Sequence, residues 1–558
     1  MLKLGWSKAD VVLVTGDAYV DSPYSGVAVI GQVLARAGYR VAILSQPDMS
    51  DPGAFRSLGE PSLFWGISPG CVDSMVANYT ATGKRRRQDD FTPGGENNRR
   101  PDRAAIAYAI RASWKATRPI ILGGVEASLR RIAHYDFWSN KVRRPVLCDA
   151  KADALCYGMG ERTILAFAEA VKKGEDWRNI PGLCWMASEK DFVPPEGAIE
   201  LPSFAEVSAD TPEGKKAFAE AFLKFYRNQD YVTARPLIQK VDNRYLVHNP
   251  PAHPLEQDEL DSVHSIKWML DAPPSIRALG KIRALDTIRF GVTTHRGCYG
   301  ECRFCAIAVH QGRRIVSRSQ NSIVDEVKGF SSHPLFRGVV SDVGGPTANM
   351  YGFDCAKKSS TGVCRNRSCL FPGPCPALNP NHRPQLELLR RLRALDGVRH
   401  VFVASGIRPD IVAADKSCGD EYISAIAKHH VSGQLKLAPE HVVGHVLECM
   451  GKPSVKSLLE FKRKFDAASK RCAKKQFLTY YFIAAHPGCT EANMRELKNF
   501  AERSLNLRPE QVQIFTPTPM TAATCMYYTG LDPFTCRRVY VARGLGEKQR
   551  QKDVLTRR

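Results

Sequence analysis

The sequence of 558 residues predicts an α/β protein in which a doubly wound domain is followed by a partial (β/α)6 barrel. Two observations predict this class. In the first 200 residues, apolar runs that end in glycine alternate with helix-like segments, and after residue 286 six more apolar runs alternate with amphipathic ones. Because such folds carry their chemistry at the carboxyl ends of the strands, the loops after the strands are the candidate sites.

The first domain is expected over residues 1–200. An apolar run at 10–16 is typical of a buried strand, 27–37 has helical periodicity, and 40–45 is the next strand. Together they make a βαβ unit with parallel strands. The pattern of a strand followed by glycine occurs again at 119–124 and 152–158. We therefore expect a sheet whose ligand crevice lies at the carboxyl ends of its strands.

Two segments lie outside this pattern. Residues 81–102 are polar and rich in charge, proline and glycine, so we expect an exposed, partly disordered loop that covers the crevice. Its basic run at 84–87 could contact phosphates, although such runs are more often simply solvated. Residues 201–285 are expected to connect the two domains, with a helix at 212–228 that begins after the cap residue Thr211.

The barrel is expected over residues 286–530, followed by a short basic tail at 531–558. Its strand-like runs lie at 288–292, 338–343, 401–405, 435–438, 478–484 and 512–515. Helical candidates alternate with them at 322–330, 385–394, 420–430, 454–470 and 491–504. Units at this spacing favour a parallel barrel, or part of one, with its site at the strand ends.

Charge and cysteine content narrow the environments and partners that we expect. The chain carries 79 Lys and Arg against 57 Asp and Glu, a net charge of +22, which fits a polyanionic partner such as RNA but also a merely basic tail. The 17 cysteines, an odd number in a chain without a recognisable export signal, favour reduced thiols and a cytoplasmic location. No run is apolar and long enough for a membrane span, so no membrane partner is expected.

Three cysteines, Cys298, Cys302 and Cys305, directly follow the first strand-like run of the barrel. Their spacing also fits one helix face, so buried structural cysteines are one interpretation, and a zinc site is another. Structural zinc usually takes four protein ligands, whereas each iron of a 4Fe–4S cluster is held by its own thiolate. Three thiolates would leave one iron open to another ligand. Arg296 and Arg303 add positive charge, which lowers thiol pKa and suits an anionic cluster.

A second group of cysteines falls in a segment rich in proline, glycine and asparagine, at Cys355, Cys364, Cys369 and Cys375. Such a segment does not pack a core, and thiols in an exposed loop are open to oxidation. We therefore expect a second metal site in this insert, 355–375, either an auxiliary cluster or zinc. The spacing is not a standard zinc pattern, and surface thiols are the alternative.

Several motifs together carry a family resemblance. The cysteine loop has the pattern CxxxCxΦC, with the aromatic Phe304 before the last cysteine. Further motifs are VTGDAYVD at 14–21, HRGC at 295–298, HQGR at 310–313, GGPTANMY at 344–351, LAPEH at 437–441, AAHPG at 484–488 and MYYTG at 526–530. From about residue 10 to 535 the chain resembles the YgiQ family of radical S-adenosylmethionine (radical SAM) proteins. The resemblance also implies that the N-terminal domain is similar to the cobalamin-binding domains of other radical SAM enzymes.

What this resemblance implies is a radical SAM enzyme. Cys298, Cys302 and Cys305 would hold a 4Fe–4S cluster whose open iron chelates the amine and carboxylate of S-adenosylmethionine. An electron from the cluster, supplied by a reductant such as flavodoxin or ferredoxin, would cleave the sulfonium to a 5′-deoxyadenosyl radical, which abstracts hydrogen from a substrate that the sequence does not reveal. The alternatives are RNA or tRNA methylthiolation, cobalamin-dependent methylation and, in another class, a basic RNA-binding protein with a structural cluster.

The resemblance also implies contacts to S-adenosylmethionine. Phe304 would lie near the adenine, and Gly344 and Gly345 stand where such enzymes hold the methionine amine. Pro346 follows the glycines where related motifs carry an acidic residue. Candidates for ribose and carboxylate contacts stand at the ends of the third and fourth barrel strands, with ordinary loop polarity as the alternative: Ser405, Arg408 and Glu440.

The N-terminal domain departs from one pattern of the domains it resembles. Cobalamin domains that ligate cobalt carry the motif DxHxxG in the first loop, and here Asp21 and Gly26 keep the spacing while Pro23 stands at the histidine position. Proline cannot ligate a metal, which excludes a histidine-bound cobalamin at this loop. Cobalamin held without that ligand, and a domain that kept only the fold, are both left open.

Overall fold

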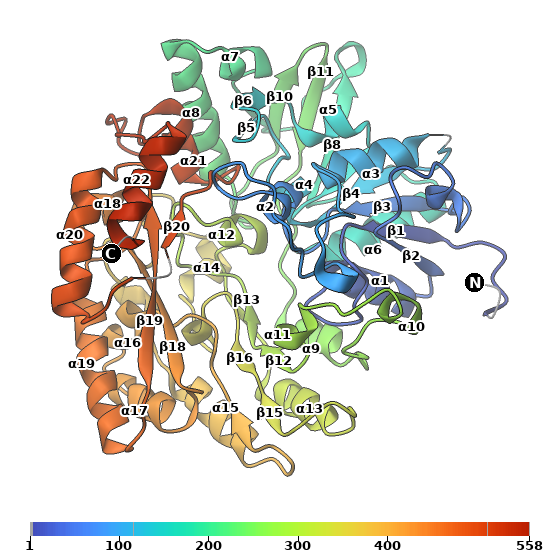
Figure 1. Cartoon of the computed structure of the whole chain (residues 1–558). Coiled ribbons are helices and arrows are strands. Elements are labelled where there is room, and N and C mark those ends of the chain that lie inside the picture. The colour runs from blue at the N-terminus through green and yellow to red at the C-terminus, as the bar shows by residue number, and fades with distance from the viewer. Residues whose placement is uncertain (1–3, 115, 510–511, 557–558) are drawn as a thin grey trace. The chain divides into compact units, whose positions relative to one another are not determined.

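The computed structural model describes residues 4–114, 116–509 and 512–556, and Figure 1 shows its helices and strands. The chain divides into two compact units. Unit 1 comprises Met1–Leu255 and Ile266–Arg289, and unit 2 comprises Glu256–Ser265 and Phe290–Arg558. Each unit has its own strands and its own core, so each is described by itself.

Unit 1 is built on a nine-stranded sheet with the order β2-β1-β3-β4-β7-β8-β11-β10-β9. The first five strands in that order are parallel: β2 (Val41–Ser45), β1 (Val11–Thr15), β3 (Phe64–Ser68), β4 (Ile120–Leu122) and β7 (Ala154–Cys156). Every residue of β1 is buried between its two neighbours. This order confirms the predicted doubly wound sheet, and it places the switch point between β1 and β3, where ligand crevices of such sheets lie.

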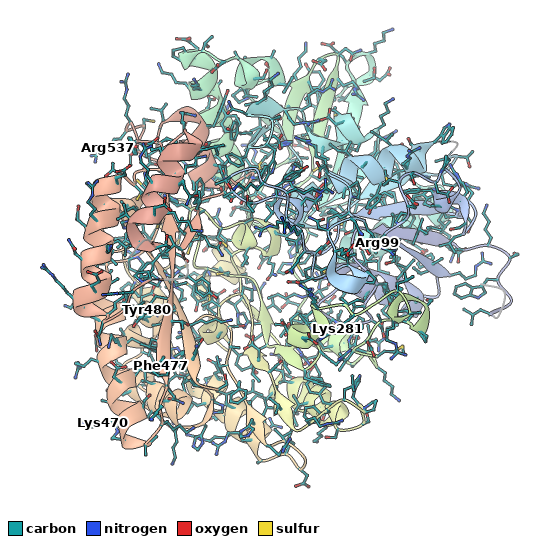
Figure 2. The ribbon with its side chains drawn as sticks, viewed as in Figure 1. Arg99, Lys281, Lys470, Phe477, Tyr480 and Arg537 are labelled. Atoms are coloured by element: carbon teal, nitrogen blue, oxygen red, sulfur yellow. The ribbon has the colours of Figure 1, made fainter. Side chains whose placement is uncertain are left out.

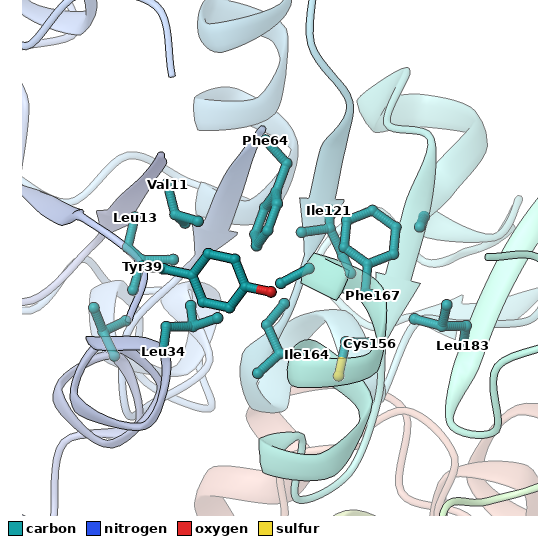
Figure 3. Close-up of a cluster of buried hydrophobic side chains, with 13 residues drawn as sticks. Val11, Leu13, Leu34, Tyr39, Phe64, Ile121, Cys156, Ile164, Phe167 and Leu183 are labelled. Carbon is teal, nitrogen blue, oxygen red and sulfur yellow. The ribbon is translucent and has the colours of Figure 1, made fainter. Parts of the chain in front are cut away.

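One core cluster of unit 1 lies between this sheet and two helices, α1 (Gly26–Arg36) and α6 (Glu161–Lys173). Figure 3 shows Leu13, Phe64 and Ile121 of the strands beside Leu34 of α1 and Phe167 of α6. The rings of Phe64 and Phe167 meet edge to face, with centroids 5.2 Å apart. The helix α1 lies within one residue of the range predicted for it, 27–37.

Most of residues 201–285 belong to unit 1. There β10 (Leu237–Val241) and β11 (Arg244–His248) form an antiparallel hairpin, which joins β9 (Ile199–Leu201) on one side and β8 (Leu183–Ser188) on the other. The helix α8 (Pro212–Arg227) confirms the predicted helix. The side chain of Thr211 caps it by accepting a hydrogen bond from the backbone N–H of Gly214 at 3.1 Å.

Unit 2 contains the predicted partial barrel. Its strands are β12 (Gly291–Thr293), β15 (Val339–Val340) with β16 (Asp342–Gly344), β17 (His400–Val401), β18 (Gln434–Glu440), β19 (Phe477–Ala484) and β20 (Val512–Ile514). β12 pairs with β16, β15 pairs with β17, and β18, β19 and β20 pair in that order, all in parallel. A parallel bridge from Ile407 to Leu437 joins the two halves. The strands therefore follow one another in chain order around the arc.

Helices return the chain between these strands: α13 (Gln320–Phe330), α15 (Arg383–Arg393), α17 (Gly419–His429), α19 (Lys456–Arg471) and α20 (Glu491–Ser504). All five confirm the predicted helices. The segment at 288–292, predicted as a strand, differs, because a helical turn, α11 (Leu285–Ile288), precedes a strand that begins only at Gly291. A short apolar run does not distinguish a helical turn from a strand. The basic tail contains α22 (Leu545–Thr556), which packs against α20.

No helix in the described part of the chain is both long enough and apolar enough to cross a membrane.

The insert at 81–102 differs from its predicted form in its second half. Residues 83–88 are exposed, as expected, but Asp89, Thr92, Asn97 and Arg100 are buried. Charged residues tolerate burial when they pair with one another, and Arg100 pairs with Asp89 at 3.0 Å. The prediction of an exposed loop was therefore wrong for these four residues. The charged side chains among them pair with one another inside the protein instead of facing solvent.

Candidate active site

The three-cysteine loop begins just after β12, the first strand of the barrel. A short antiparallel pair, β13 (His295–Arg296) with β14 (Val316–Ser317), holds its start, and α12 (Ile307–Gln311) follows it. Gly297 has a φ of 86°, and a Cβ at this position would lie 1.9 Å from the carbonyl oxygen of Arg314. Only glycine fits such a position, so the turn that presents Cys298 depends on it.

The thiols of Cys298, Cys302 and Cys305 line one cavity of about 200 Å³ at the carboxyl ends of the barrel strands. Other side chains in its wall come from the loops after β16, β17 and β18. Burial raises the pKa of Cys298, and it raises the pKa of Cys305 to about 12. These thiols therefore keep their protons until a bound cation displaces them.

The donor set consists of three thiols on one loop, and its chemistry fits a 4Fe–4S cluster. Among the described residues, no group of three His, Cys, Asp or Glu side chains converges closely enough to hold one ion. A cluster does not need such convergence, because each thiolate binds a different iron. Three cysteines on one loop that face a common cavity meet that requirement.

Arg408 brings a fixed positive charge to the cysteine loop. Its Nε and Nη2 donate to the carboxylate of Asp410 at 3.1 and 2.7 Å, and its Nη1 lies 3.5 Å from the Sγ of Cys302. Burial alone would lower the pKa of Arg408, but Asp410 and Cys302 outweigh burial and raise it. The guanidinium therefore stays charged. The sequence predicted that Arg408 contacts S-adenosylmethionine. In the structure Arg408 contacts Cys302, a predicted cluster ligand.

Glu440 and Lys452 form an ion pair in the wall of the same cavity. The Nζ of Lys452 lies 3.7 Å from the Oε1 of Glu440 and 6.0 Å from the centroid of the Phe304 ring. Burial raises the pKa of the Glu440 carboxyl, and Lys452 opposes that rise. The φ of Glu440 is 67°, at a bulge in β18, and such a strained backbone costs about 1–3 kcal/mol for a residue other than glycine. Strain of this kind gathers at functional sites.

Gly344, Gly345 and Ser405 lie in the packing around His295 and Asp342. A Cβ on Gly345 would lie 2.6 Å from the His295 ring, and one on Gly344 would lie 2.6 Å from the Ser405 hydroxyl. The Ser405 hydroxyl donates to Asp342, which also accepts the backbone N–H of Ser405 at 3.0 Å. Close packing therefore explains both glycines, and the contacts of these three residues to S-adenosylmethionine stay predictions.

Other residues of the cavity wall were not assigned a role from the sequence: Thr347, Asp410, His441 and Lys452. The hydroxyl of Thr347 lies 3.7 Å from the Sγ of Cys298. Burial lowers the pKa of His441 to about 3, so its ring is neutral, and its Nε2 lies 3.5 Å from the Sγ of Cys489. Thr347 and His441 belong to the GGPTANMY and LAPEH motifs, which are the signals that could have found them, whereas Lys452 belongs to no motif.

The second group of cysteines lies in the insert between β16 and α15. Cys369 packs with Cys298 against one apolar cluster, so the insert folds onto the cysteine loop. The backbone N–H of Cys375 donates to the carbonyl of Cys369 at 2.8 Å, while Cys355 is half-buried and Cys364 is exposed. None of these thiols belongs to a described trio that could hold a single ion. A second metal site stays a prediction.

A partial barrel with three cysteines after its first strand, preceded by a doubly wound unit, defines the radical SAM class of proteins. Residues 1–291 match the family described as Radical SAM N-terminal, and residues 510–558 match a domain of unknown function (DUF3362). The chain belongs to the UPF0313 family. It is 52% identical to a UPF0313 protein of Fusobacterium nucleatum, over 100% of this chain and 97% of that protein. These matches confirm the family that the motifs indicate.

Two further relatives extend the match to other lineages. A UPF0313 protein of Methanocella arvoryzae is 46% identical, over 99% of this chain and 91% of its own length. One of Thermotoga maritima is 45% identical, over 99% of this chain and 96% of its own length. The likeness therefore covers both units of the chain.

Solved structures with a similar fold are cobalamin-binding radical SAM enzymes. The radical SAM methyltransferase TsrM of Kitasatospora setae, with cobalamin and a [4Fe-4S] cluster bound, has a TM-score of 0.51 and 15% identity, covering 92% of this chain and 74% of that one. The cobalamin-dependent enzyme OxsB, with aqua-cobalamin bound, has a TM-score of 0.50 and 13% identity, covering 93% and 55%. At such identities the likeness concerns the fold alone.

Proposed function

We propose that this protein is an iron–sulfur enzyme in which Cys298, Cys302 and Cys305 hold a 4Fe–4S cluster that binds S-adenosylmethionine. The observation that carries the proposal is that these three thiols share one cavity with Arg408 and with the Glu440–Lys452 ion pair. When bound and reduced, the cluster supplies the electron that converts S-adenosylmethionine to a 5′-deoxyadenosyl radical.

The chain's own side chains have separable roles in this proposal. Arg408 holds a positive charge against Cys302, which stabilises additional negative charge on a cluster. Glu440 and Lys452 offer one charge of each sign, which matches an amino acid moiety that carries both an amine and a carboxylate. The ring of Phe304 supplies an apolar surface for adenine, and the ring of His441 is neutral.

Part of the cavity wall is apolar, formed by Ile307, Ile407, Leu437, Leu447 and Leu458. A reactive radical needs such an environment, because water and stray hydrogen donors would otherwise intercept it. The substrate must then enter beside these residues and place a C–H bond near the ribose of S-adenosylmethionine.

Reductive cleavage of S-adenosylmethionine tests this function directly. Anaerobically reconstituted protein with dithionite should form 5′-deoxyadenosine, and the Cys302→Ala variant should form none. Cys472→Ala is the matched control, since Cys472 lies at the end of α19, outside the cavity wall. Protein with a full complement of iron and sulfide that yields no 5′-deoxyadenosine would contradict the proposal, as would unchanged yield from Cys302→Ala.

We further propose that the substrate or partner is RNA, because the chain carries a net charge of +22. A basic surface that contacts phosphates gives affinity that falls steeply with salt. The 5′-deoxyadenosyl radical would then abstract a hydrogen atom from an RNA nucleoside and become 5′-deoxyadenosine, and methylthiolation of RNA is one reaction that begins in this way. Binding of tRNA that falls as salt rises supports this proposal, and no binding at low salt contradicts it.

We propose a cytoplasmic location with a flavodoxin or ferredoxin as electron donor. The 17 cysteines form no disulfide among the described residues, which suits a reducing compartment. The test is whether reduced flavodoxin or ferredoxin reduces the cluster under anaerobic conditions, measured by absorbance. Failure of both donors to reduce the cluster would contradict the proposed electron donor.

A further inference from the structure

The switch point of the sheet in unit 1 is the place where this fold would hold a cofactor. The order β2-β1-β3-β4-β7 has the flavodoxin-like form 2-1-3-4-5, in which ligands bind outside the carboxyl ends of the first and third strands. Cobalamin is the group that the similar solved structures suggest. The residues that lie in the crevice decide whether cobalamin fits there.

The crevice is occupied by a buried arginine of the chain itself. The Nη1 of Arg100 donates to the carbonyl oxygen of Pro69, directly after β3, at 2.8 Å. It also pairs with Asp17, two residues after the end of β1, at 2.7 Å. Its Nη2 pairs with Asp89 at 3.0 Å. Arg100 is only 1% exposed. One guanidinium therefore ties together the two strand ends between which a ligand would enter.

The residues that precede Arg100 in the insert also occupy the crevice. The backbone N–H of Ala18 donates to the carbonyl of Phe91 at 2.9 Å, so the loop after β1 hydrogen-bonds to the insert. The Nε2 of Gln46, after β2, donates to the Thr92 hydroxyl at 2.7 Å and to the Gly16 carbonyl at 3.0 Å. Gln46 and Thr92 are both buried. Three strand ends are thus bonded to residues 89–100.

A second segment of unit 1, residues 280–284, is also hydrogen-bonded to this insert. The backbone N–H of Gly94 donates to the carbonyl of Lys281 at 3.0 Å, and that of Ala284 donates to the carbonyl of Asp90 at 3.0 Å. A Cβ on Gly95 would lie 2.7 Å from the side chain of Arg283. Residues 89–100 are therefore held between the strand ends and residues 280–284.

The first loop supplies no place for cobalt either. Asp21, the acid of the DxHxxG spacing, accepts the backbone N–H of Met269 at 2.9 Å, the Tyr19 hydroxyl at 3.1 Å and the Gln32 amide at 3.2 Å. Pro23 occupies the histidine position. The carboxylate that would orient a cobalt-ligating histidine is thus committed to other donors.

We propose that residues 89–100 are a built-in plug of the switch-point crevice and that unit 1 does not bind cobalamin there. A corrin ring would have to expel a buried guanidinium together with two carboxylates that depend on it, which is strongly unfavourable. The unit keeps the fold of a cobalamin domain and uses the crevice for its own chain. A methylation that needs cobalamin in this crevice is therefore not the reaction of this protein. This inference does not depend on the function proposed for unit 2.

The test measures corrinoid binding and backbone exposure in the full chain. Wild-type protein is incubated anaerobically with hydroxocobalamin and dialysed, and hydrogen exchange of residues 89–97 is followed with and without the corrinoid. Arg100→Met removes the central ion pairs, and Arg99→Met is the matched control, because Arg99 is an exposed neighbour that Figure 2 labels.

We expect wild type and Arg99→Met to retain no corrinoid and to exchange residues 89–97 slowly, and we expect faster exchange in Arg100→Met. Corrinoid retained by the wild type with unchanged exchange at 89–97 would contradict the expected lack of binding, although it would place the corrinoid outside the closed crevice. One corrinoid per chain with accelerated exchange at 89–97 would overturn the proposal. The wild-type arms decide the question even if Arg100→Met does not fold.

Discussion

The Nη1 of Arg408 lies 3.5 Å from the Sγ of Cys302, and Asp410 fixes the other side of the same guanidinium. This contact joins the loops after two different strands of the barrel. It gives a predicted cluster ligand a permanent positive neighbour, and hydrogen bonds and charge near the sulfurs set the reduction potential of iron–sulfur clusters.

Replacing Arg408 by methionine should therefore make the cluster harder to reduce. A positive charge stabilises the more negative, reduced state, so its removal should lower the midpoint potential by roughly 60 mV, about tenfold in a one-electron equilibrium. A potentiometric titration followed by electron paramagnetic resonance measures the shift. Arg383→Met, at an exposed arginine of α15, should leave the potential unchanged. A potential in Arg408→Met equal to that of the wild type would show that the contact has no electrostatic role.

Alanine substitutions at two glycines near the cysteine loop should distinguish the cost of backbone strain from the cost of a steric clash. Gly297 and Gly312 have φ values of 86° and 85°, but a Cβ would meet the Arg314 carbonyl only at Gly297. Gly312→Ala should cost about 1–3 kcal/mol of folding free energy from strain alone, because its ψ of 174° lies in a region that is essentially restricted to glycine. Gly297→Ala should cost more and should also reduce the iron bound per chain. Denaturant unfolding and iron analysis check both, and equal effects of the two variants would contradict the account.

Glu440 should contribute to the affinity for S-adenosylmethionine. Its carboxylate lies in the cavity beside Lys452, so Glu440→Gln removes a charge complementary to the amine and the sulfonium. We expect the dissociation constant to rise by about tenfold, or about 1.4 kcal/mol, in calorimetric titrations. Glu448→Gln is the control, since Glu448 is an exposed residue of the nearby helix α18 (Gly444–Met450). Equal affinities of the two variants for S-adenosylmethionine would show that Glu440 does not contribute to binding.

Lys548 should make the free energy of unfolding depend on pH. Its Nζ donates to the hydroxyl of Tyr527 at 2.7 Å, and burial lowers the pKa of Lys548 to about 8. The unfolded chain keeps that proton to a pH of about 10, so it binds more protons, and the free energy of unfolding should rise as the pH increases from 8 to 10. Melting temperatures should show this rise in the wild type and in Lys470→Met, an exposed control that Figure 2 labels. A rise of the same size in Lys548→Met would rule out this assignment.

Local patterns predicted most of the fold, and non-local contacts explain what they missed. Helical periodicity found α13 and α20 because it is a property of adjacent turns. The contact of Arg408 with Cys302 joins residues 106 positions apart, and no local pattern encodes it. The burial of Arg100 was not predicted for the same reason. Its partner Asp17 lies far from it in the sequence, in the loop after β1. Local polarity there indicated an exposed loop, and only the fold shows that these charges neutralise one another.

The central claim is that the three thiols hold a cluster with an iron open to S-adenosylmethionine. The most direct measurement is the electron paramagnetic resonance spectrum of the reduced, reconstituted protein before and after addition of S-adenosylmethionine. The account predicts a cluster signal whose g values change when S-adenosylmethionine binds, and the loss of that signal in Cys302→Ala. A fully loaded cluster whose spectrum is the same with and without S-adenosylmethionine would contradict it.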